Sequence, residues 1–453
     1  MENKTVKFID LFAGLGGIRL GFESAFKNLG IKTECVMTSE IKPYAVKTLK
    51  HNFKHDYLVG DIFEIRNEFI PDFDFLLGGF PCQPFSAGGK RQGFVDTRGT
   101  LFFEIERILR DKKPFGFILE NVEGLVRHDL ENKNDEIGRT LSTIYYKLQN
   151  DLGYNVSWKV FDSLEFGLPQ SRKRIFIVGT RDEKVDLNGN VPEFKALTAI
   201  LEKGLNTIKS DFVTKILSHF KLEELYGKSI KDKRGGDNNI HSWDIGLKGE
   251  ISKKQSVLLS KLFKERRRKK WAQEIGIDWM DGMALTLQQI NTFIKCSENE
   301  LELMLKDLTQ KGYLKFEHPK KLVKEQTENG IKSFRIYDET KPKGYNIVTG
   351  KLSFEINKIL DPNDIAPTLV ATDVSRLAVP DGDGLRRLTI REGLRLFGYP
   401  EWYEIPTKEE DAFDLLGNTV AVPVVEFVAA KLANIYTESQ LVLLTSSKTP
   451  VCS

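Results

Sequence analysis

A cysteine between two prolines is the first candidate for chemistry in this sequence. Cys82 lies in the stretch 78–86 (GGFPCQPFS) and is one of four cysteines. Pro81 and Pro84 restrict φ on either side of it, so its thiol would be held on a stiff loop. An apolar run at 73–77 predicts a buried strand that delivers this loop to the carboxyl edge of an open α/β sheet, where such sheets bind ligands. A buried, inert cysteine beside a proline turn is the alternative, which this stretch alone does not exclude.

Three predicted strands ahead of this loop end in residues suited to a nucleoside. The strand at 6–11 runs into the glycine-rich turn 10–18 and then a helix, so backbone N–H groups can approach a ligand at the positive end of that helix. A strand at 34–38 ends at Glu40, and one at 57–59 ends at Asp61. A carboxylate about 20 residues beyond the turn suits ribose hydroxyls. A dinucleotide and S-adenosylmethionine both fit this edge, although the turn lacks the G-x-G-x-x-G spacing.

Strands and helices continue to alternate up to residue 180. An amphipathic helix is predicted from residue 100 to about 110, a strand at 115–119 that ends at Glu120, a helix at 137–152 and a strand at 154–161. Three cations in 170–174 (QSRKR) then lead into a strand at 175–179. This alternation predicts a doubly wound α/β sheet with right-handed crossovers.

Composition excludes several classes of protein. The 453 residues, 40% of them hydrophobic, are enough for two domains. The cysteines are widely spaced, without a Cys-x-x-Cys pair or a Cys/His cluster, so we expect neither a disulfide framework nor a metal site. No apolar run approaches the roughly 20 residues that span a bilayer, and the start does not resemble a signal peptide, so we expect a cytoplasmic protein without a membrane partner.

The ordered motifs of the chain resemble those of the C5-cytosine DNA methyltransferases of bacterial restriction-modification systems. The resemblance covers residues 6–180 and 365–430. Its motifs are 10–17 (DLFAGLGG), 60–62 (GDI), 79–86 (GFPCQPFS), 98–102 (RGTLF), 120–122 (ENV), 170–174 (QSRKR), 387–389 (RLT), 396–400 (LFGYP) and 417–420 (GNTV).

The resemblance implies a Rossmann-like, S-adenosylmethionine-dependent methyltransferase sheet with an inserted smaller target-recognition domain. Accordingly we expect a catalytic and cofactor-binding domain at 1–183 and a variable target-recognition region at 184–365. A hinge and DNA-side scaffold would follow at 366–416, and the segment 417–453 would return to the catalytic domain and close the cofactor pocket.

The resemblance also assigns catalytic residues. C5 of cytosine is a poor nucleophile, and a thiolate that adds at C6 makes C5 reactive toward a methyl sulfonium. Cys82 matches the family's nucleophile, and Glu120 matches the carboxyl that stabilises the charge near N3. Arg174 and Arg172 would hold the base and its phosphate by forked hydrogen bonds and lower the pKa of the thiol. The base that removes the C5 proton is not evident.

The resemblance also assigns the residues that bind the cofactor, S-adenosyl-L-methionine. Ile41 stands where the family often has an aromatic residue that stacks on adenine, so aliphatic packing must serve there. The set consists of Phe12, Gly14, Leu15, Gly16 and Gly17 for the methionine end, Glu40 for the ribose, Ile41, Asp61 and Ile62 for the adenine, and Pro81, Leu101 and Asn418 lining the site.

The implied substrate is double-stranded DNA, from which the cytosine is flipped into the pocket. The basic loop 88–93 fits a segment that closes over DNA, although such loops are often only solvated. The protein would act as a monomer on DNA, be associated with the nucleoid through it, and have a restriction endonuclease as functional partner.

The middle of the chain is basic, and no family motif covers it. Residues 181–350 hold 32 Lys and Arg against 25 Asp and Glu, and the run 261–271 is the densest. On DNA such a run mainly neutralises phosphates; a solvated helix face is the alternative. Within 285–340 we expect two short helices, the second opened by a capping box at Ser297, and two strands at 313–316 and 333–337. A Lys-rich connection with a glycine at its tip would join the two strands. Together these elements resemble a winged helix-turn-helix. A helical hairpin that only packs against the rest of the protein, without contacting DNA, explains this pattern equally well.

Three other functions fit parts of the sequence. Methylation of a tRNA cytosine is one, since an RNA-acting branch shares these motifs, but the long basic middle segment favours DNA. A catalytically silent DNA-binding protein is another, and the set of Cys82, Glu120 and Arg174 argues against it. The missing glycine spacing argues against a nicotinamide oxidoreductase.

Overall fold

The computed structural model describes residues 5–55, 57–80, 101–132, 134–189, 193–232, 238–277, 282–327, 330–348, 354–371 and 374–446. The chain forms two compact units. The first comprises Met1–Glu202, Pro362–Ser375 and Leu388–Ser453, and the second comprises Lys203–Asp361 and Arg376–Arg387. In the described part of the chain, no single helix is both long and apolar enough to cross a membrane.

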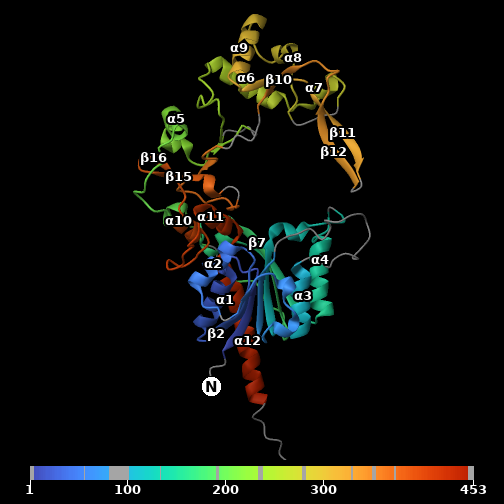
Figure 1. The fold of residues 1–453 in the computed structure, drawn as a ribbon, viewed down its shortest axis with the longest axis vertical. Coiled ribbons are helices and arrows are strands. Elements are labelled where there is room, and N and C mark those ends of the chain that lie inside the picture. Colours follow the sequence, from blue (N-terminus) through green and yellow to red (C-terminus); the bar gives the residue numbers. More distant parts are fainter. Residues whose placement is uncertain are drawn as a thin grey trace, which may run out of the picture. The chain divides into compact units, whose positions relative to one another are not determined.

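The first unit is built on a seven-stranded sheet in the order β3-β2-β1-β4-β5-β7-β6 (Figure 1). The first five strands are parallel, whereas β7 is antiparallel to both β5 and β6. The strands are β1 (Val6–Leu11), β2 (Thr33–Ser39), β3 (Leu58–Val59), β4 (Phe75–Gly79), β5 (Gly116–Val122), β6 (Asn155–Asp162) and β7 (Lys173–Thr180). The predicted α/β class is confirmed, but the alternation of elements did not reveal that the last two strands form an antiparallel pair.

Helices cover both faces of this sheet, as Figure 1 shows. On one face α1 (Gly17–Asn28) and α12 (Val422–Ser446) bury an aromatic core with strands β1 and β4. A Cβ on Gly21 would lie 2.6 Å from Cβ of Val425, so glycine at this position allows the two helices to approach closely. On the other face α3 (Leu101–Lys112) and α4 (Arg139–Tyr146), which a π-turn at Lys147–Asp151 continues, bury aliphatic side chains of β4, β5 and β7. The remaining helices are α2 (Pro43–Asn52), α10 (Ile390–Leu396) and α11 (Glu409–Asn418).

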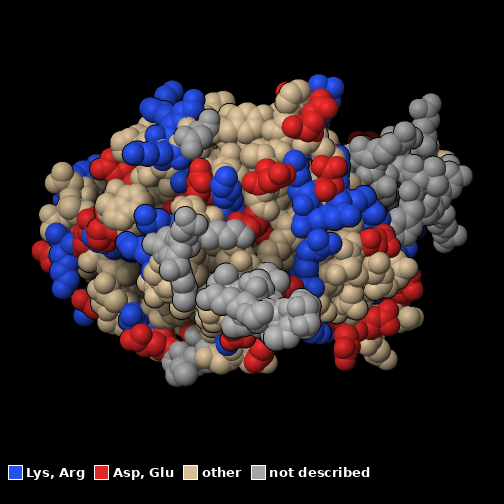
Figure 2. Space-filling model, turned by 90° about the horizontal axis from the view of Figure 1, so that it is seen from below, with Lys and Arg blue, Asp and Glu red and all other residues tan. Residues whose placement is uncertain are grey.

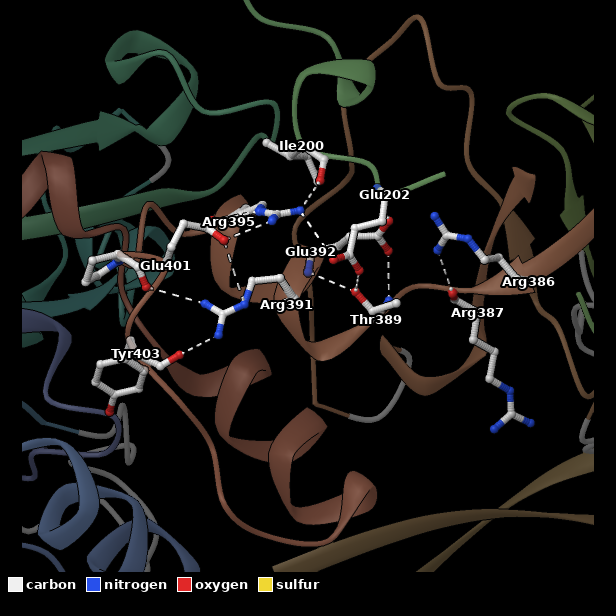
Figure 3. Close-up of polar contacts among 11 residues, drawn as sticks. Ile200, Glu202, Arg386, Arg387, Thr389, Arg391, Glu392, Arg395, Glu401 and Tyr403 are labelled. Carbon is white, nitrogen blue, oxygen red and sulfur yellow. Dashed lines mark hydrogen bonds and ion pairs between the residues drawn. The ribbon is translucent and has the colours of Figure 1, made fainter. Parts of the chain in front are cut away.

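A polar network joins the segment around Ile200 to α10 (Figure 3). Arg395 binds both carboxylate oxygens of Glu401 at 2.8 and 2.9 Å and donates to the carbonyl of Ile200 at 3.2 Å. Glu202 accepts a hydrogen bond from the Thr389 hydroxyl at 2.9 Å, and its backbone N–H donates to Glu392 at 2.8 Å. These contacts hold the end of the long N-terminal part of the first unit against its C-terminal part.

Among its described residues, the second unit has two hydrophobic cores and three small sheets. One core is helical and includes Leu258, Leu262, Leu301 and Leu305, and the other surrounds a five-stranded sheet of order β16-β15-β14-β8-β9. Its helices are α5 (Asp211–His219), α6 (Lys253–Glu265), α7 (Lys269–Glu274), α8 (Leu287–Asn291) and α9 (Glu298–Gln310). Its strands are β8 (Ser229–Ile230), β9 (Asn239–Ile240), β10 (Leu314–Glu317), β11 (Lys320–Thr327), β12 (Gly330–Tyr337), β13 (Gly344–Ile347), β14 (Lys358–Ile359), β15 (Leu377–Asp381) and β16 (Gly384–Arg387).

The structure changes the strand pairing expected within 285–340. The two helices form, and the hydroxyls of Thr286 and Ser297 cap them by accepting from backbone N–H groups three residues on. However, β10 pairs with β13, outside the predicted module, and the Lys-rich stretch expected to be a connection is strand β11, which pairs with β12. The stretch was mistaken for a connection because its many lysines obscure the period-two pattern of a strand.

The basic run 261–271 is partly buried. Arg266 is 4% exposed and donates to Oδ1 of Asn346 at 2.7 Å, and Trp271 is also buried. The guanidinium of Arg266 therefore supports the helical core of its own unit. In the space-filling view, Lys and Arg side chains are interspersed with Asp and Glu over the visible face (Figure 2), as the near balance of 67 cations and 64 anions leads one to expect.

Candidate active site

The carboxyl ends of β1 to β5 define one edge of the first unit's sheet, and most of the predicted site residues follow these ends. Because β7 is antiparallel, its first residues lie at the same edge, where Arg174 is paired with Val122 of β5. Glu120 lies two residues before Val122 and so on the same face. The chain thus brings a carboxylate and a cation together from strands that are not neighbours in sequence.

The glycine-rich turn after β1 has a backbone that few residues tolerate. Phe12 has a φ of 58°, and Gly14 and Gly16 have φ of 54° and 66°. Gly16 is the N-cap of α1, so the turn ends at the positive end of that helix. Leu15 is buried, and its carbonyl accepts a hydrogen bond from the Tyr403 hydroxyl at 2.5 Å.

Gly17 is the tightest position of the turn. A Cβ there would lie 2.5 Å from the hydroxyl oxygen of Tyr399 and 2.9 Å from a methyl carbon of Val420. Real Cβ atoms do not approach other atoms this closely, so a larger residue would displace its neighbours. Gly17 therefore allows the start of α1 to lie against the C-terminal part of the first unit.

Glu40 joins the glycine turn to the start of α2. One carboxylate oxygen accepts from the N–H of Gly14 at 2.8 Å, and the other accepts from the N–H groups of Ile41 and Lys42 at 2.9 and 2.8 Å. Three charge-assisted hydrogen bonds hold the carboxylate at the tip of β2. The side chain of Ile41 is 69% exposed, which leaves an apolar surface beside it.

The other predicted cofactor residues lie at the ends of elements. Asp61 accepts from the N–H of Phe63 at 3.0 Å and caps the short 3-10 helix Ile62–Glu64, whose Ile62 is buried. Leu101 is the first residue of α3, and the exposed Asn418 is the last residue of α11. The amide of Asn418 donates to the carbonyl of Asp414 at 2.8 Å. That these residues line a cofactor site stays a prediction.

Glu120 and Arg174 form a buried ion pair. Nε of Arg174 lies 3.1 Å from Oε1 of Glu120. Glu120 is 8% exposed. Burial raises the pKa of the Glu120 carboxyl above its ordinary value, and the charges of Arg174 and Arg172 oppose this rise. Burial also lowers the pKa of Arg174. A carboxyl in this environment can hold a proton at a higher pH than an exposed one.

Arg172 is placed to support the backbone. Its guanidinium donates to the carbonyls of Leu369 at 2.8 Å and Gly417 at 3.1 Å, and it lies over the ring of Phe397. It is 2% exposed, and burial lowers its pKa to about 9. These contacts join β7 to two C-terminal segments. Its predicted contact with the base or phosphate stays a prediction.

Cys82 and Pro81 lie outside the described residues, as does the loop 88–93, but the residues just before them are placed. Gly79 at the end of β4 is paired with Glu120, and the carbonyl of Phe80 accepts from the side chain of Asn121 at 2.9 Å. The chain therefore enters the segment that contains Cys82 directly beside Glu120. Burial raises the pKa of Cys35 to about 11, which keeps that thiol protonated and makes it unsuitable as a nucleophile.

Asp10 is a titratable residue for which the sequence predicts no role. It is fully buried, and neither carboxylate oxygen has a hydrogen-bond partner among the described residues. Burial raises its pKa to about 7, with Arg19 opposing the rise. The signal in the sequence is a carboxylate between Ile9 and Leu11 in a strand whose only other charged residue is Lys7.

Comparisons with known proteins identify relatives over nearly the whole length of the chain. The family model described as C-5 cytosine-specific DNA methylase matches residues 6–434. The chain is 57% identical to the Type II methyltransferase M.NlaIV of Neisseria lactamica over 94% of this chain and 98% of that protein. It is 41% identical to the Type II methyltransferase M.BanI of Aneurinibacillus aneurinilyticus over 94% and 95%. A solved structure of a prophage-encoded E. coli protein aligns with a TM-score of 0.51 at 22% identity, over 95% of this chain and 99% of that one, and supports the fold.

Proposed function

Because the chain belongs to the C-5 cytosine-specific DNA methylases, we propose that it methylates a cytosine within a specific double-stranded sequence, with S-adenosyl-L-methionine as the donor. The methylation of cytosine at C5 in DNA is the reaction of this family, so the chain is a DNA (cytosine-5-)-methyltransferase. The observation that carries the proposal is the buried Glu120–Arg174 pair beside the point where the chain enters the Cys82 segment.

In this mechanism Cys82 is the nucleophile. Its thiolate adds to C6 of the flipped cytosine and forms a C–S bond, while an electron pair of the ring moves toward N3. Glu120 donates a proton or a hydrogen bond to N3, and Arg174 holds Glu120 in position. After methyl transfer, loss of the C5 proton re-forms the ring double bond and expels the thiolate. The raised pKa of Glu120 supports its role as the donor.

The first unit's sheet edge fits S-adenosyl-L-methionine. When bound, the cofactor supplies an electrophilic methyl group on a sulfonium. The positive-φ turn of Phe12, Gly14 and Gly16 at the start of α1 would hold the methionine end, with Leu15 and Gly17 shaping the turn. The carboxylate of Glu40 would accept from the ribose, and the exposed side chain of Ile41 would pack on the adenine. Asp61, Ile62, Pro81, Leu101 and Asn418 would complete the lining.

We assign target recognition to the second unit and its flanking segments. The region 184–365 would select the sequence, 366–416 would serve as the hinge and DNA-side scaffold, and 417–453 would close the cofactor site. Several relatives carry the name Type II methyltransferase, which supports a role as the modification half of a restriction system with a cognate endonuclease. Acting on DNA as a monomer is part of the same proposal.

Transfer of a labelled methyl group tests the proposal. The purified chain is incubated with labelled S-adenosyl-L-methionine and either duplex DNA that contains many sequences or a pool of tRNA. We expect label in the DNA as 5-methylcytosine and none in the tRNA. Label in tRNA alone would establish the RNA-directed alternative. Binding of DNA without any transfer would establish the silent DNA-binding alternative.

A further inference from the structure

The paired strands β11 and β12 form a ribbon that is solvent-exposed on both faces. Figure 1 shows them projecting from the helices of their own unit. Four large apolar side chains of the ribbon are between 36% and 47% exposed; they are Leu322, Phe334, Ile336 and Tyr337. An isolated two-stranded ribbon is at best marginally stable in water, and antiparallel sheets ordinarily bury one face. The ribbon therefore has the features of a surface that a partner covers.

In the described part of the chain, the side-chain contacts that anchor the ribbon lie at its base. The hydroxyl of Tyr337 donates to Glu317 at 2.8 Å, and Nζ of Lys321 lies 3.4 Å from Asp338. Lys324 and Arg335, farther from the base, are exposed, and among the described residues neither has an ion-pair partner. Two cations are thus presented to solvent on a support whose base is fixed.

The register separates two different faces. Residues directly opposite each other in an antiparallel pair share a face, and the faces alternate along each strand. One face presents Lys320 opposite Tyr337, Leu322 opposite Arg335 and Lys324 opposite Ser333, followed by Gln326. This face, which we call the basic face, carries three cations and no acidic residue. By the same register, the opposite face carries Lys321 opposite Ile336, Val323 opposite Phe334 and Glu325 opposite Lys332, so it combines two cations with one acid.

The second helix of the expected winged module is poorly suited to contact DNA. Helix α9 contains four acidic residues, Glu298, Glu300, Glu302 and Asp307, against the single cation Lys306. Leu301, Leu305 and Leu308 face the core, so the acidic residues lie mainly on its outer side. Such a surface repels phosphates.

We propose that the basic face of the β11–β12 ribbon inserts into a groove of the target DNA and reads bases there. This inference rests on the proposed action on duplex DNA and names the element that selects the site. The major groove admits a two-stranded ribbon, and an arginine in it can donate two hydrogen bonds to guanine. Arg335 is placed to contact a base edge, while Lys320 and Lys324 on the same face contact phosphates.

Single substitutions in the full-length protein test this assignment. The recognised sequence is first read from the DNA of cells that express the wild type, and duplexes with each base pair changed are then methylated in vitro. Arg335→Ala should reduce discrimination at one base pair by about 5- to 150-fold, the ratio that one forked contact provides. Lys324→Ala should weaken binding to all duplexes alike and lower the slope of log affinity against log salt by about 1. Because both residues are exposed, the melting temperature should not change.

Lys306→Ala is the matched control, since it removes one exposed cation from α9. It should leave discrimination and affinity unchanged. Unchanged discrimination in Arg335→Ala together with an unchanged salt slope in Lys324→Ala would overturn the inference. The inference would also be overturned if these variants changed the sedimentation coefficient of the protein and left DNA binding unchanged. In that case the ribbon would contact a second copy of the chain. Failure of the wild type to methylate any DNA would instead refute the proposed function.

Discussion

At the scale of single residues, the chemistry depends on how Glu120 is held. The Arg174 side chain approaches it from a strand that is antiparallel to β5, and burial raises the pKa of the carboxyl. A protonated or hydrogen-bonding carboxyl can stabilise the electron pair that develops at N3, whereas a carboxylate repels it. In the proposed mechanism Glu120 therefore serves as an acid, and Arg174 positions it.

Glu120→Gln should lower kcat for methyl transfer by about 10²-fold or more, the usual contribution of general acid catalysis. Affinity for DNA and for the methyl donor should change little, because the amide keeps the shape of the carboxyl. In the wild type kcat should fall as pH rises through the pKa of Glu120, and this decline should be absent from the variant. Arg174→Lys keeps a cation beside Glu120 and should therefore retain more activity than Glu120→Gln. Full activity of Glu120→Gln would exclude this role for the carboxyl.

Asp10 should make stability dependent on pH. Its pKa is about 7 when folded and 3.8 as its ordinary value, so between these values the folded chain binds a proton that the unfolded chain does not. Stability should therefore fall as pH rises from about 4 to about 7 and stay reduced above that. The total effect is on the order of 4 kcal/mol, at about 1.4 kcal/mol per unit of pKa.

Asp10→Asn removes this effect. The variant should melt at a higher temperature than the wild type at pH 8 and at a similar temperature near pH 4, as measured by calorimetry without methyl donor. Asp111→Asn, which changes an exposed carboxylate, is the control and should leave the profile unchanged. If the melting temperatures of Asp10→Asn and the wild type changed with pH in parallel, this would contradict the presence of a buried carboxyl without a hydrogen-bond partner at this position.

At the scale of elements, the start of α1 depends on the space at Gly17. Alanine within a helix is ordinarily more stable than glycine by about 1 kcal/mol. Here the added Cβ would lie 2.5 Å from the hydroxyl of Tyr399, and overpacking of this kind costs about 1–3 kcal/mol. The steric cost should win, so Gly17→Ala should lower the free energy of unfolding and weaken binding of the methyl donor.

Calorimetry and donor titration measure both effects of Gly17→Ala. Removing the obstructing hydroxyl with Tyr399→Phe should recover part of the loss in the double variant, as expected for residues in contact. Gly60→Ala is the control, since a Cβ there would meet nothing within 4 Å. Loss of the same size from both glycines would show that the crowding at Gly17 is not the cause.

The elements also show what the sequence could predict. Strands β1, β2, β4 and β5 each contain a short apolar run and lead into a polar or glycine-rich tip, so their positions and their common edge follow from the pattern. The direction of β7 does not, because it depends on its pairing with β5 and β6 in space. The sequence of β11 predicts a connection and not a strand, because exposure on both faces removes the alternation that marks a strand.

The same distinction applies to the site. Glu40 and Glu120 were predicted because they stand at strand tips in sequence. By contrast, the guanidinium of Arg172 contacts the carbonyls of Leu369 and Gly417, which lie 197 and 245 residues away in sequence, and no local pattern indicates such contacts. The apolar neighbours of Asp10 in sequence indicate that it is buried, but only the structure shows that its burial is complete, that its carboxylate has no hydrogen-bond partner among the described residues, and hence that its pKa is unusual.

At the scale of the whole molecule, our proposals assign chemistry and sequence selection to different units of one chain. The chain passes from the first unit to the second after Glu202 and after Ser375, and returns after Asp361 and after Arg387. The sheet edge with Glu40 and Glu120 belongs to the first unit, and the β11–β12 ribbon belongs to the second. Each unit has hydrophobic cores of its own, so exposed residues of the ribbon can be changed without disturbing the catalytic residues.

The central claim is that Cys82, with Glu120 and Arg174, methylates C5 of cytosine in one DNA sequence. Bisulfite sequencing of DNA from cells that express the full chain tests it most directly, because it reports the modification together with its sequence context. The wild type should protect one cytosine in a single recurring sequence. Cys82→Ser, produced at the same level, should leave every such site unprotected. Full protection by Cys82→Ser, or protected cytosines without a common sequence, would contradict the account.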